Sequence, residues 1–329
     1  MFPLLSIQNL NISFSQEGKL VPALHNISFS VNRGETVAIV GESGSGKSIT
    51  SLAVLQLLPV PPARYTSGKI IFSVPGEPAA DLLRLSEQEM RYVRGNKIAM
   101  IFQEPMTSLN PLYTCGNQVT EAILLHQRIN YKNAKQKAIE LFEKVQLPDP
   151  VTMFNRFPHE ISGGMRQRVA IASAILLSPK LIIADEPTTA LDVTIQAQIL
   201  ELIRELKSTL QTAIVLISHD IGVIAQICEN MAVMYAGTIV ESGMTSKILA
   251  NPLHPYTKGL LNAVPSVRSR NRVLESIPGT VPPPSQRFAG CIFQDRCQFA
   301  IPKCSEVNPG LLPVDDGRLV ACHLVAGAC

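Results

Sequence analysis

Charged residues are scarce in this chain of 329 amino acids, at 17%, and neither sign dominates: 29 Lys and Arg face 26 Asp and Glu, a formal net charge of +3 at pH 7. A net charge this small does not indicate nucleic acid or an anionic membrane surface as the main partner, since both select strongly basic faces. The length is sufficient for a sizeable buried core and for two domains.

The sequence also lacks a long hydrophobic run. Its most apolar stretch, residues 169–184, is interrupted by two serines, a proline and a lysine. No segment therefore reaches the roughly 18 uninterrupted apolar residues that a membrane-spanning helix needs. Residues 1–14 have no basic flank and no small-residue cleavage site, and their alternation is typical of a strand and not of a signal peptide. We therefore expect a cytosolic chain.

The order of apolar patterns predicts an α/β fold. Residues 1–75 show mostly strand patterns, and residues 86–146 are mostly helical, with helices expected near 116–127 and 133–146. Further along, helices alternate with near-continuous apolar strands, which is typical of a parallel sheet covered on both faces. From about residue 251 prolines and then cysteines accumulate. This predicts a small C-terminal appendage on a stiff, Pro-rich connector.

The strongest motif is the glycine-rich segment GESGSGKS, which follows an apolar strand and opens a helix. It matches the phosphate-binding loop G-x-x-x-x-G-K-[S/T] in the context that this motif requires, and an ordinary Gly/Ser turn is disfavoured for that reason. The glycines let backbone N–H groups face phosphate oxygens, and the helix N-terminus adds its positive end. Lys47 is expected to reach the β- and γ-phosphates, and the Ser48 hydroxyl to bind Mg²⁺. The ATP-binding residues predicted here are Gly41, Ser43, Gly44, Ser45, Gly46, Lys47, Ser48 and Ile49.

A second motif, LIIADEP, ends an apolar strand with two acids, Asp185 and Glu186. Ligands bind at this carboxyl end of the strands in open α/β sheets. We expect Asp185 to hold the Mg²⁺ shell and Glu186 to act as general base on the attacking water. The alternative, acids that merely begin a helix before Pro187, is disfavoured because a phosphate-binding loop needs such a partner.

A third motif, ISGGMRQR, places Ser162 where it can cap a helix. The free N–H groups of that helix can bind an anion. The motif on its own indicates only a capped helix. It becomes informative because it stands shortly before Asp185 in a chain that already has a phosphate-binding loop.

These motifs, together with Gln103 in IFQEP, the TTALD segment and His219 in LISHD, follow the order found in ATP-binding cassette (ABC) ATPases. The chain resembles that family over nearly its whole length. The resemblance implies a P-loop cassette at residues 1–250, with an antiparallel β subdomain and a helical subdomain inserted at about 104–177. Residues 251–329 would form the C-terminal region.

The resemblance also implies roles for single residues. Gln103 would sense Mg²⁺ and the attacking water and take part in the Mg²⁺ site, and His219 would contact the γ-phosphate and position Glu186. Asp192 would lie across the interface of a head-to-tail dimer. Phe14 would stack on adenine, although a plain core position in a strand is the alternative. The signature residues that would close on the nucleotide of the opposite protomer are Ser162, Gly163, Gly164 and Met165.

Three further features resemble the ATPase subunits of bacterial dipeptide and oligopeptide importers, a group that includes nickel and glutathione systems. They are TSLNPLYT after the Gln103 segment, HPYTKGLL after the last cassette strand, and the Pro- and Cys-rich tail. The resemblance implies a second ATPase subunit, two permeases and an external solute-binding protein as partners. It places the chain on the cytoplasmic face of the cell membrane, as a peripheral subunit without nucleic acid.

Five of the seven cysteines crowd the C-terminal tail, four of them spaced C-x5-C-x6-C-x17-C. This spacing departs from the C-x2-C pairs of zinc sites and from ferredoxin clusters. A short segment without a core of its own is often stabilised by a bound metal ion or cluster, so a metal site is still expected here. Importer ATPases with a similar tail carry a [4Fe-4S] cluster, so iron–sulfur is the first expectation, zinc the second, and four unliganded thiols the alternative. The ligands would be Cys291, Cys297, Cys304 and Cys322, with His323 and Cys329 in reserve and Cys115 and Cys228 as packing residues.

Other classes of ABC protein are also conceivable. Soluble ABC ATPases that act on DNA, the ribosome or Fe–S assembly usually have two cassettes, coiled-coil insertions or a strongly basic face, none of which is evident here. A non-catalytic regulatory cassette is disfavoured by the intact Glu186 and His219. Within transport, nickel or glutathione uptake is the main alternative to peptides.

Overall fold

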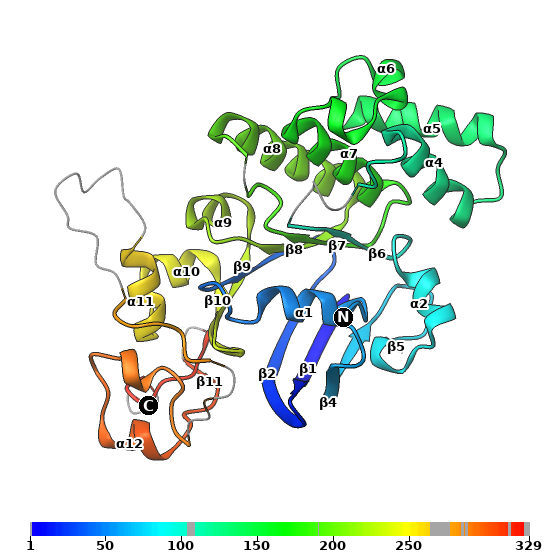
Figure 1. Ribbon diagram of the computed structural model, residues 1–329. Helices are drawn as coiled ribbons and strands as arrows, with labels where there is room; N and C mark the ends of the chain where they lie inside the picture. Colours follow the sequence, from blue (N-terminus) through cyan, green and yellow to red (C-terminus); the bar gives the residue numbers. More distant parts are fainter. Residues whose placement is uncertain are drawn as a thin grey trace. The chain divides into compact units, whose positions relative to one another are not determined.

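The computed structural model describes residues 2–103, 109–189, 191–263, 277–283, 286, 289–314 and 317–325 (Figure 1). The chain forms two compact units. Unit 1 comprises residues 1–31, 36–83 and 216–329, and unit 2 comprises residues 32–35 and 84–215. The chain passes between the units on either side of residues 32–35, within η1 (Leu82–Arg84) and within β8 (Ala213–Ile217). Residues from both ends of the sequence therefore share unit 1.

One sheet of unit 1 is antiparallel, as the resemblance implies for the β subdomain. Its strands are β1 (Leu5–Gln16), β2 (Lys19–Val31), β4 (Ala63–Phe72) and β5 (Ala80–Asp81), in the order β2-β1-β4-β5. A two-residue turn joins β1 to β2, and both of its residues, Glu17 and Gly18, have positive φ angles of 50° and 78°. This turn geometry matches the twist of an antiparallel hairpin.

The other strands of unit 1 combine parallel and antiparallel pairing. The fully buried β3 (Thr36–Val40) runs parallel to β9 (Asn230–Tyr235), and β9 pairs antiparallel with β10 (Thr238–Met244). Helix α1 (Lys47–Val54) follows β3 through the glycine-rich loop. The unit also contains the helices α9 (Ile221–Ile227), α10 (Thr245–Ala250) and α11 (Pro255–Asn262).

The C-terminal residues join this sheet. The short strand β12 (Leu319–Val320) pairs with β10 on one side and with β11 (Leu312–Pro313) on the other. The buried Arg318 guanidinium lies 3.3 Å from the fully buried Glu241 carboxylate of β10. Two short helices, η3 (Gln294–Arg296) and α12 (Pro302–Glu306), complete the region. Because strand pairing and a buried ion pair both connect it, the C-terminal region is part of unit 1.

Unit 2 has a parallel strand pair and a set of helices. β6 (Ile98–Ile101) runs parallel to β7 (Leu181–Asp185) in the register Ile98 opposite Leu181. The two helices expected near 116–127 and 133–146 are present as α4 (Cys115–His126) and α5 (Tyr131–Lys144). The other elements are α2 (Glu87–Val93), α6 (Pro150–Asn155), η2 (Pro158–Glu160), α7 (Gly163–Ile175) and α8 (Val193–Leu210).

Local sequence signals account for the helix starts of unit 2. The side-chain oxygens of Thr114, Asn130 and Asp149 accept hydrogen bonds from backbone N–H groups in the first turns of α4, α5 and α6. Such caps satisfy donors that have no partner inside the helix. The apolar faces of these helices bury Val119, Phe142 and other large side chains. Across the described ranges, no helix is both long and apolar enough to cross a membrane.

Candidate nucleotide site

The glycine-rich loop of unit 1 has the backbone of a phosphate cradle. Gly41, Gly44 and Gly46 have φ angles of 154°, 80° and 101°, a region that side chains rarely allow. A Cβ atom on Gly41 would lie 2.1 Å from the Met234 carbonyl oxygen, whereas one on Gly44 would meet nothing within 4 Å. The glycine at 41 is therefore required by a neighbouring strand, and the one at 44 by backbone conformation alone.

Lys47 begins α1 and is only 7% exposed. Its Nζ donates hydrogen bonds to the carbonyl oxygens of Gly41, at 2.8 Å, and Glu42, at 3.0 Å. The ammonium group thus lies against the loop that would hold the phosphates. The first turn of α1 contains no acidic side chain, so its positive end is not opposed locally. Ser45 is fully buried in the loop, while Ser48 and Ile49 are half-buried.

In unit 2, Gln103 and Glu186 lie side by side. They follow β6 and β7, and parallel neighbours end at the same edge of a sheet. Gln103 Nε2 donates a hydrogen bond to Glu186 Oε2 at 3.0 Å, and Thr189 Oγ1 donates to the same oxygen at 2.8 Å. Asp185, the last residue of β7, is 4% exposed. A buried carboxylate favours a cation nearby, and binding of Mg²⁺ by Asp185 stays a prediction.

Thr189 was not among the residues predicted from the sequence. It lies in the TTALD segment, whose aspartate alone had an expected role. Its hydroxyl and the Gln103 amide together fix one oxygen of Glu186. The backbone contributes too, because Glu186 has a positive φ of 46°. That conformation is unusual for a residue other than glycine and is often found at functional sites.

The signature segment opens α7 as expected. Ser162 is its N-cap, and Ser162 Oγ accepts a hydrogen bond from the Met165 backbone N–H at 3.3 Å. Ser162 and Gly163 are exposed, and Gly164 and Met165 are half-buried. Free N–H groups at an exposed helix start are suited to an anion. Binding of a nucleotide from an opposite protomer stays a prediction.

Asp192 has a structural role within the chain. It is the N-cap of α8, and its Oδ1 accepts a hydrogen bond from the Ile195 backbone N–H at 3.0 Å. Its place in a dimer interface stays a prediction.

Phe14 and His219 belong to unit 1. Phe14 is half-buried in β1, opposite Val21 of β2 and Ala63 of β4. His219 is exposed and lies two positions after the end of β8, and the next residue, Asp220, caps α9. Stacking of Phe14 on adenine and contact of His219 with the γ-phosphate stay predictions.

The four cysteines of the tail line one small cavity, together with His254, Phe293 and His323. The cavity volume is about 10 Å³, which is room for about one water molecule. Burial raises the pKa of the Cys291 thiol to about 11. Among the residues that the structure describes, no group of three or more His, Cys, Asp or Glu side chains is arranged to hold a metal ion. The described part of the structure therefore does not support the expected [4Fe-4S] cluster, although four thiols line the same cavity.

Two of the other cysteines, Cys115 and Cys228, are buried as expected. Cys115 and Cys228 are 0% and 6% exposed, as packing residues should be. Cys329 lies outside the described residues, and His323 contacts the Val307 carbonyl oxygen at 2.8 Å through Nε2.

Two protein families match this chain. Residues 24–189 match the family described as ABC transporter, and residues 240–304 match the oligopeptide/dipeptide transporter C-terminal region. A probable peptide ABC transporter ATP-binding protein of Sinorhizobium fredii is 49% identical over 97% of this chain and 94% of its own length. The oligopeptide transport ATP-binding protein OppD of Bacillus subtilis is 48% identical over 98% of this chain and 89% of its own length.

A solved structure shares the cassette fold. The ATP-binding cassette MJ0796, solved as a dimer in a post-hydrolysis state with ADP and Pi, is 27% identical, with a TM-score of 0.64 over 73% of this chain and 98% of its own. This similarity, the two family matches and the geometry at Glu186 agree with one another. The chain belongs to the ABC transporter ATPases, in the group that carries the oligopeptide/dipeptide transporter C-terminal region.

Proposed function

We propose that this chain is the ATP-hydrolysing subunit that drives import of dipeptides or oligopeptides across the cytoplasmic membrane. The observation that best supports ATPase activity is the pair of hydrogen bonds that Gln103 and Thr189 donate to Glu186, directly after β7. The match of residues 240–304 supports the peptide branch. The relatives' names refer to peptide transport, so nickel and glutathione uptake are disfavoured, as is a soluble ATPase without a transport role.

The proposed mechanism gives Glu186 the role of general base. Gln103 and Thr189 hold its carboxylate in place by hydrogen bonds to Oε2, and this carboxylate would take a proton from the attacking water. Ser48, Gln103 and Asp185 would hold Mg²⁺, which would supply charge neutralisation for the phosphates. The loop amides and Lys47 bind the phosphates, and His219 contacts the γ-phosphate. Phe14 would orient the base by stacking.

Hydrolysis would be coupled to transport through dimer closure. Ser162, Gly163, Gly164 and Met165 would bind the γ-phosphate of the nucleotide in the opposite protomer, with Asp192 at the interface. A closed dimer would then be favoured by ATP and disfavoured by ADP, because only ATP provides these contacts. The partners would be a second ATPase subunit, two membrane permeases and an extracytoplasmic solute-binding protein.

The transport proposal can be tested by extracting the tagged chain from native membranes in a mild detergent and identifying the proteins that accompany it. Recovery of two multi-span permeases and a second cassette is expected. Vesicles containing this complex and its binding protein should then take up a labelled dipeptide or oligopeptide only with ATP. Uptake of nickel or glutathione instead of peptides would contradict the proposed substrate class. Recovery of soluble partners alone would contradict the transport role.

We also propose that the cysteine cavity holds a metal in the mature protein, with iron–sulfur as the first choice and zinc as the second. Four thiols around one cavity support this proposal. Protein purified without air should be brown with absorbance near 400 nm if Cys291, Cys297, Cys304 and Cys322 bind iron–sulfur. A colourless protein with stoichiometric zinc would favour the second choice, and a metal-free protein would contradict both.

A further inference from the structure

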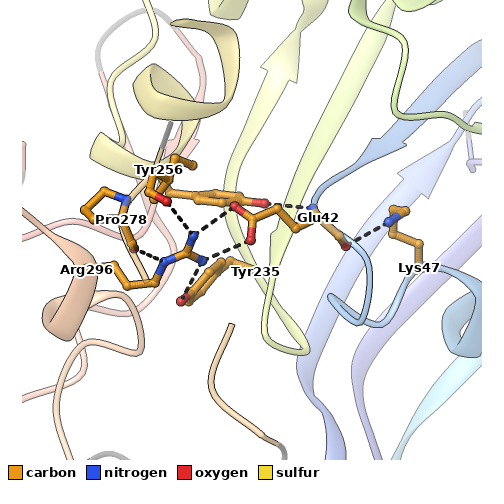
Figure 2. A network of polar contacts seen from close by, with 7 residues as sticks. Glu42, Lys47, Tyr235, Tyr256, Pro278 and Arg296 are labelled. Carbon is orange, nitrogen blue, oxygen red and sulfur yellow. Dashed lines mark hydrogen bonds and ion pairs between the residues drawn. The ribbon is translucent and has the colours of Figure 1, made fainter. Parts of the chain in front are cut away.

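The C-terminal region makes an ion pair with the phosphate loop of unit 1 (Figure 2). The Arg296 guanidinium contacts both carboxylate oxygens of Glu42, with 3.0 Å from NH1 to Oε2 and 3.3 Å from NH2 to Oε1. The Arg296 side chain is 7% exposed and the Glu42 side chain 27%. A bidentate, largely buried pair of this kind fixes orientation as well as distance.

The backbone of Glu42 is held by the same region. The Glu42 backbone N–H donates a hydrogen bond to Tyr256 Oη at 2.8 Å, and the Glu42 carbonyl oxygen accepts one from Lys47 Nζ at 3.0 Å. Tyr256 is fully buried. Glu42 therefore connects residues of the C-terminal region to the lysine that the motif assigns to the phosphates.

Arg296 is held in place independently of Glu42. Its Nε donates to the Pro278 carbonyl oxygen at 2.8 Å, and its guanidinium lies over the ring of Tyr235, 5.7 Å from the centroid. The helical turn that carries it packs through Phe293 against the rings of Tyr235 and Tyr256, with centroids 5.2 and 5.5 Å apart. The guanidinium is thus pre-positioned at the loop before any pairing with the carboxylate.

An acidic side chain inside a phosphate loop raises an electrostatic problem. The carboxylate of Glu42 would repel the negative charges of a nucleoside triphosphate bound to the adjacent residues. Arg296 neutralises that carboxylate and also holds it against the C-terminal region. Arg318 forms another buried arginine–glutamate pair, with Glu241, and contacts the Lys247 and Asn251 carbonyl oxygens.

We propose that Arg296 is a positioning residue for ATP binding: by pairing with Glu42 it cancels the carboxylate charge and fixes the phosphate loop, which makes the C-terminal region part of the nucleotide site. The proposal rests on the assignment of residues 41–48 as the ATP-binding loop. It concerns ATP affinity and not the proton transfer at Glu186.

Three variants of the full-length chain test it: Arg296→Gln, Glu42→Gln and the double variant. Removing the arginine alone leaves an unneutralised carboxylate, so Arg296→Gln should raise the Kd and KM for MgATP about tenfold with little change in kcat. The double variant should recover most of the lost affinity, because the repelling charge is gone as well. The loss in Arg296→Gln should also shrink between 50 and 500 mM KCl, since salt screens a charge effect.

Arg318→Gln is the matched control, because it breaks a buried pair of the same type in which Arg318 contacts Glu241, Lys247 and Asn251, all outside the loop. Its Kd for MgATP should stay within about twofold of the wild type. Equal losses in Arg296→Gln and Arg318→Gln, or no recovery in the double variant, would overturn the inference. Should Arg296→Gln fail to fold, Arg296→Lys retains the charge and should keep the Kd for MgATP within a few-fold of the wild type; a Kd raised about tenfold or more in that folded variant would also overturn the inference. A wild-type chain that binds no ATP would overturn the loop assignment together with the inference.

Discussion

The side-chain amide of Gln103 donates a hydrogen bond to the Glu186 carboxylate across 3.0 Å, although the two residues are 83 positions apart in the sequence. Each follows one strand of the parallel β6–β7 pair. A displacement of Gln103 would therefore break or lengthen a hydrogen bond to Glu186, the proposed base.

Glu186→Gln should lower the ATPase rate by about 10²- to 10⁴-fold, because an amide cannot accept the proton of the attacking water. ATP affinity should stay within a few-fold of the wild type, since the amide keeps the shape of the side chain. Phosphate release and equilibrium binding of a fluorescent ATP analogue measure the two effects separately. An unchanged hydrolysis rate would remove Glu186 from the role of base.

Gly41→Ala should be far more damaging than Gly44→Ala. At Gly44 the added methyl group meets nothing within 4 Å, so the cost is only that of a left-handed conformation, about 1–2 kcal/mol. At Gly41 the methyl group would lie 2.1 Å from the Met234 carbonyl oxygen, and we expect a loss of about 3 kcal/mol or more. Urea unfolding of the two variants provides the comparison. Equal losses would mean that the loop moves away from β9 without cost.

Asp192→Ala should lower the free energy of unfolding by about 0.5–2 kcal/mol, because it removes the cap of α8. Asp192→Asn retains an oxygen that can accept from the Ile195 N–H and should remain close to wild-type stability. Comparing these two variants separates the role of Asp192 as a helix cap from a role in the interface between protomers. A drop in ATPase rate in Asp192→Asn, at unchanged stability, would support the dimer interface. A stability loss of equal size in both variants would contradict the capping role.

Cys115 should resist alkylation in the native protein at pH 8. Burial raises the pKa of its thiol to about 11 from an ordinary value near 9, so the reactive thiolate is scarce as well as inaccessible. Iodoacetamide labelling followed by mass spectrometry should modify Cys115 only after unfolding in urea. Rapid native labelling would show that α4 opens at its start.

The raised pKa of the Cys115 thiol also affects the stability of the folded chain at alkaline pH. The folded chain keeps the Cys115 proton up to a pKa of about 11, whereas the unfolded chain loses it near 9. The unfolded state therefore binds fewer protons between these values, and stability should fall as pH rises from 9 to 11. Cys115→Ser should reduce this slope in unfolding experiments. If stability fell equally steeply with pH in the variant, the pH dependence could not be attributed to Cys115.

Much of the site could be predicted because its signals are local. The loop of residues 41–48 combines strand, glycines and helix within one short segment, and Ser162 caps the helix that it precedes. The alternating pattern of β1 and β2 likewise indicates strands without knowledge of the rest of the chain. Backbone conformation and helix capping depend on near neighbours, so these features follow from the order of residue types.

The tertiary structure decided how distant residues meet. Arg296 and Glu42 are 254 positions apart, and only the folded chain makes them a bidentate pair. The hydroxyl of Thr189 and the amide of Gln103 converge on one oxygen of Glu186. The tail cysteines line one cavity without forming a metal site in the part of the chain described. Pairings of this kind depend on packing and on the burial of charge, which no short segment specifies.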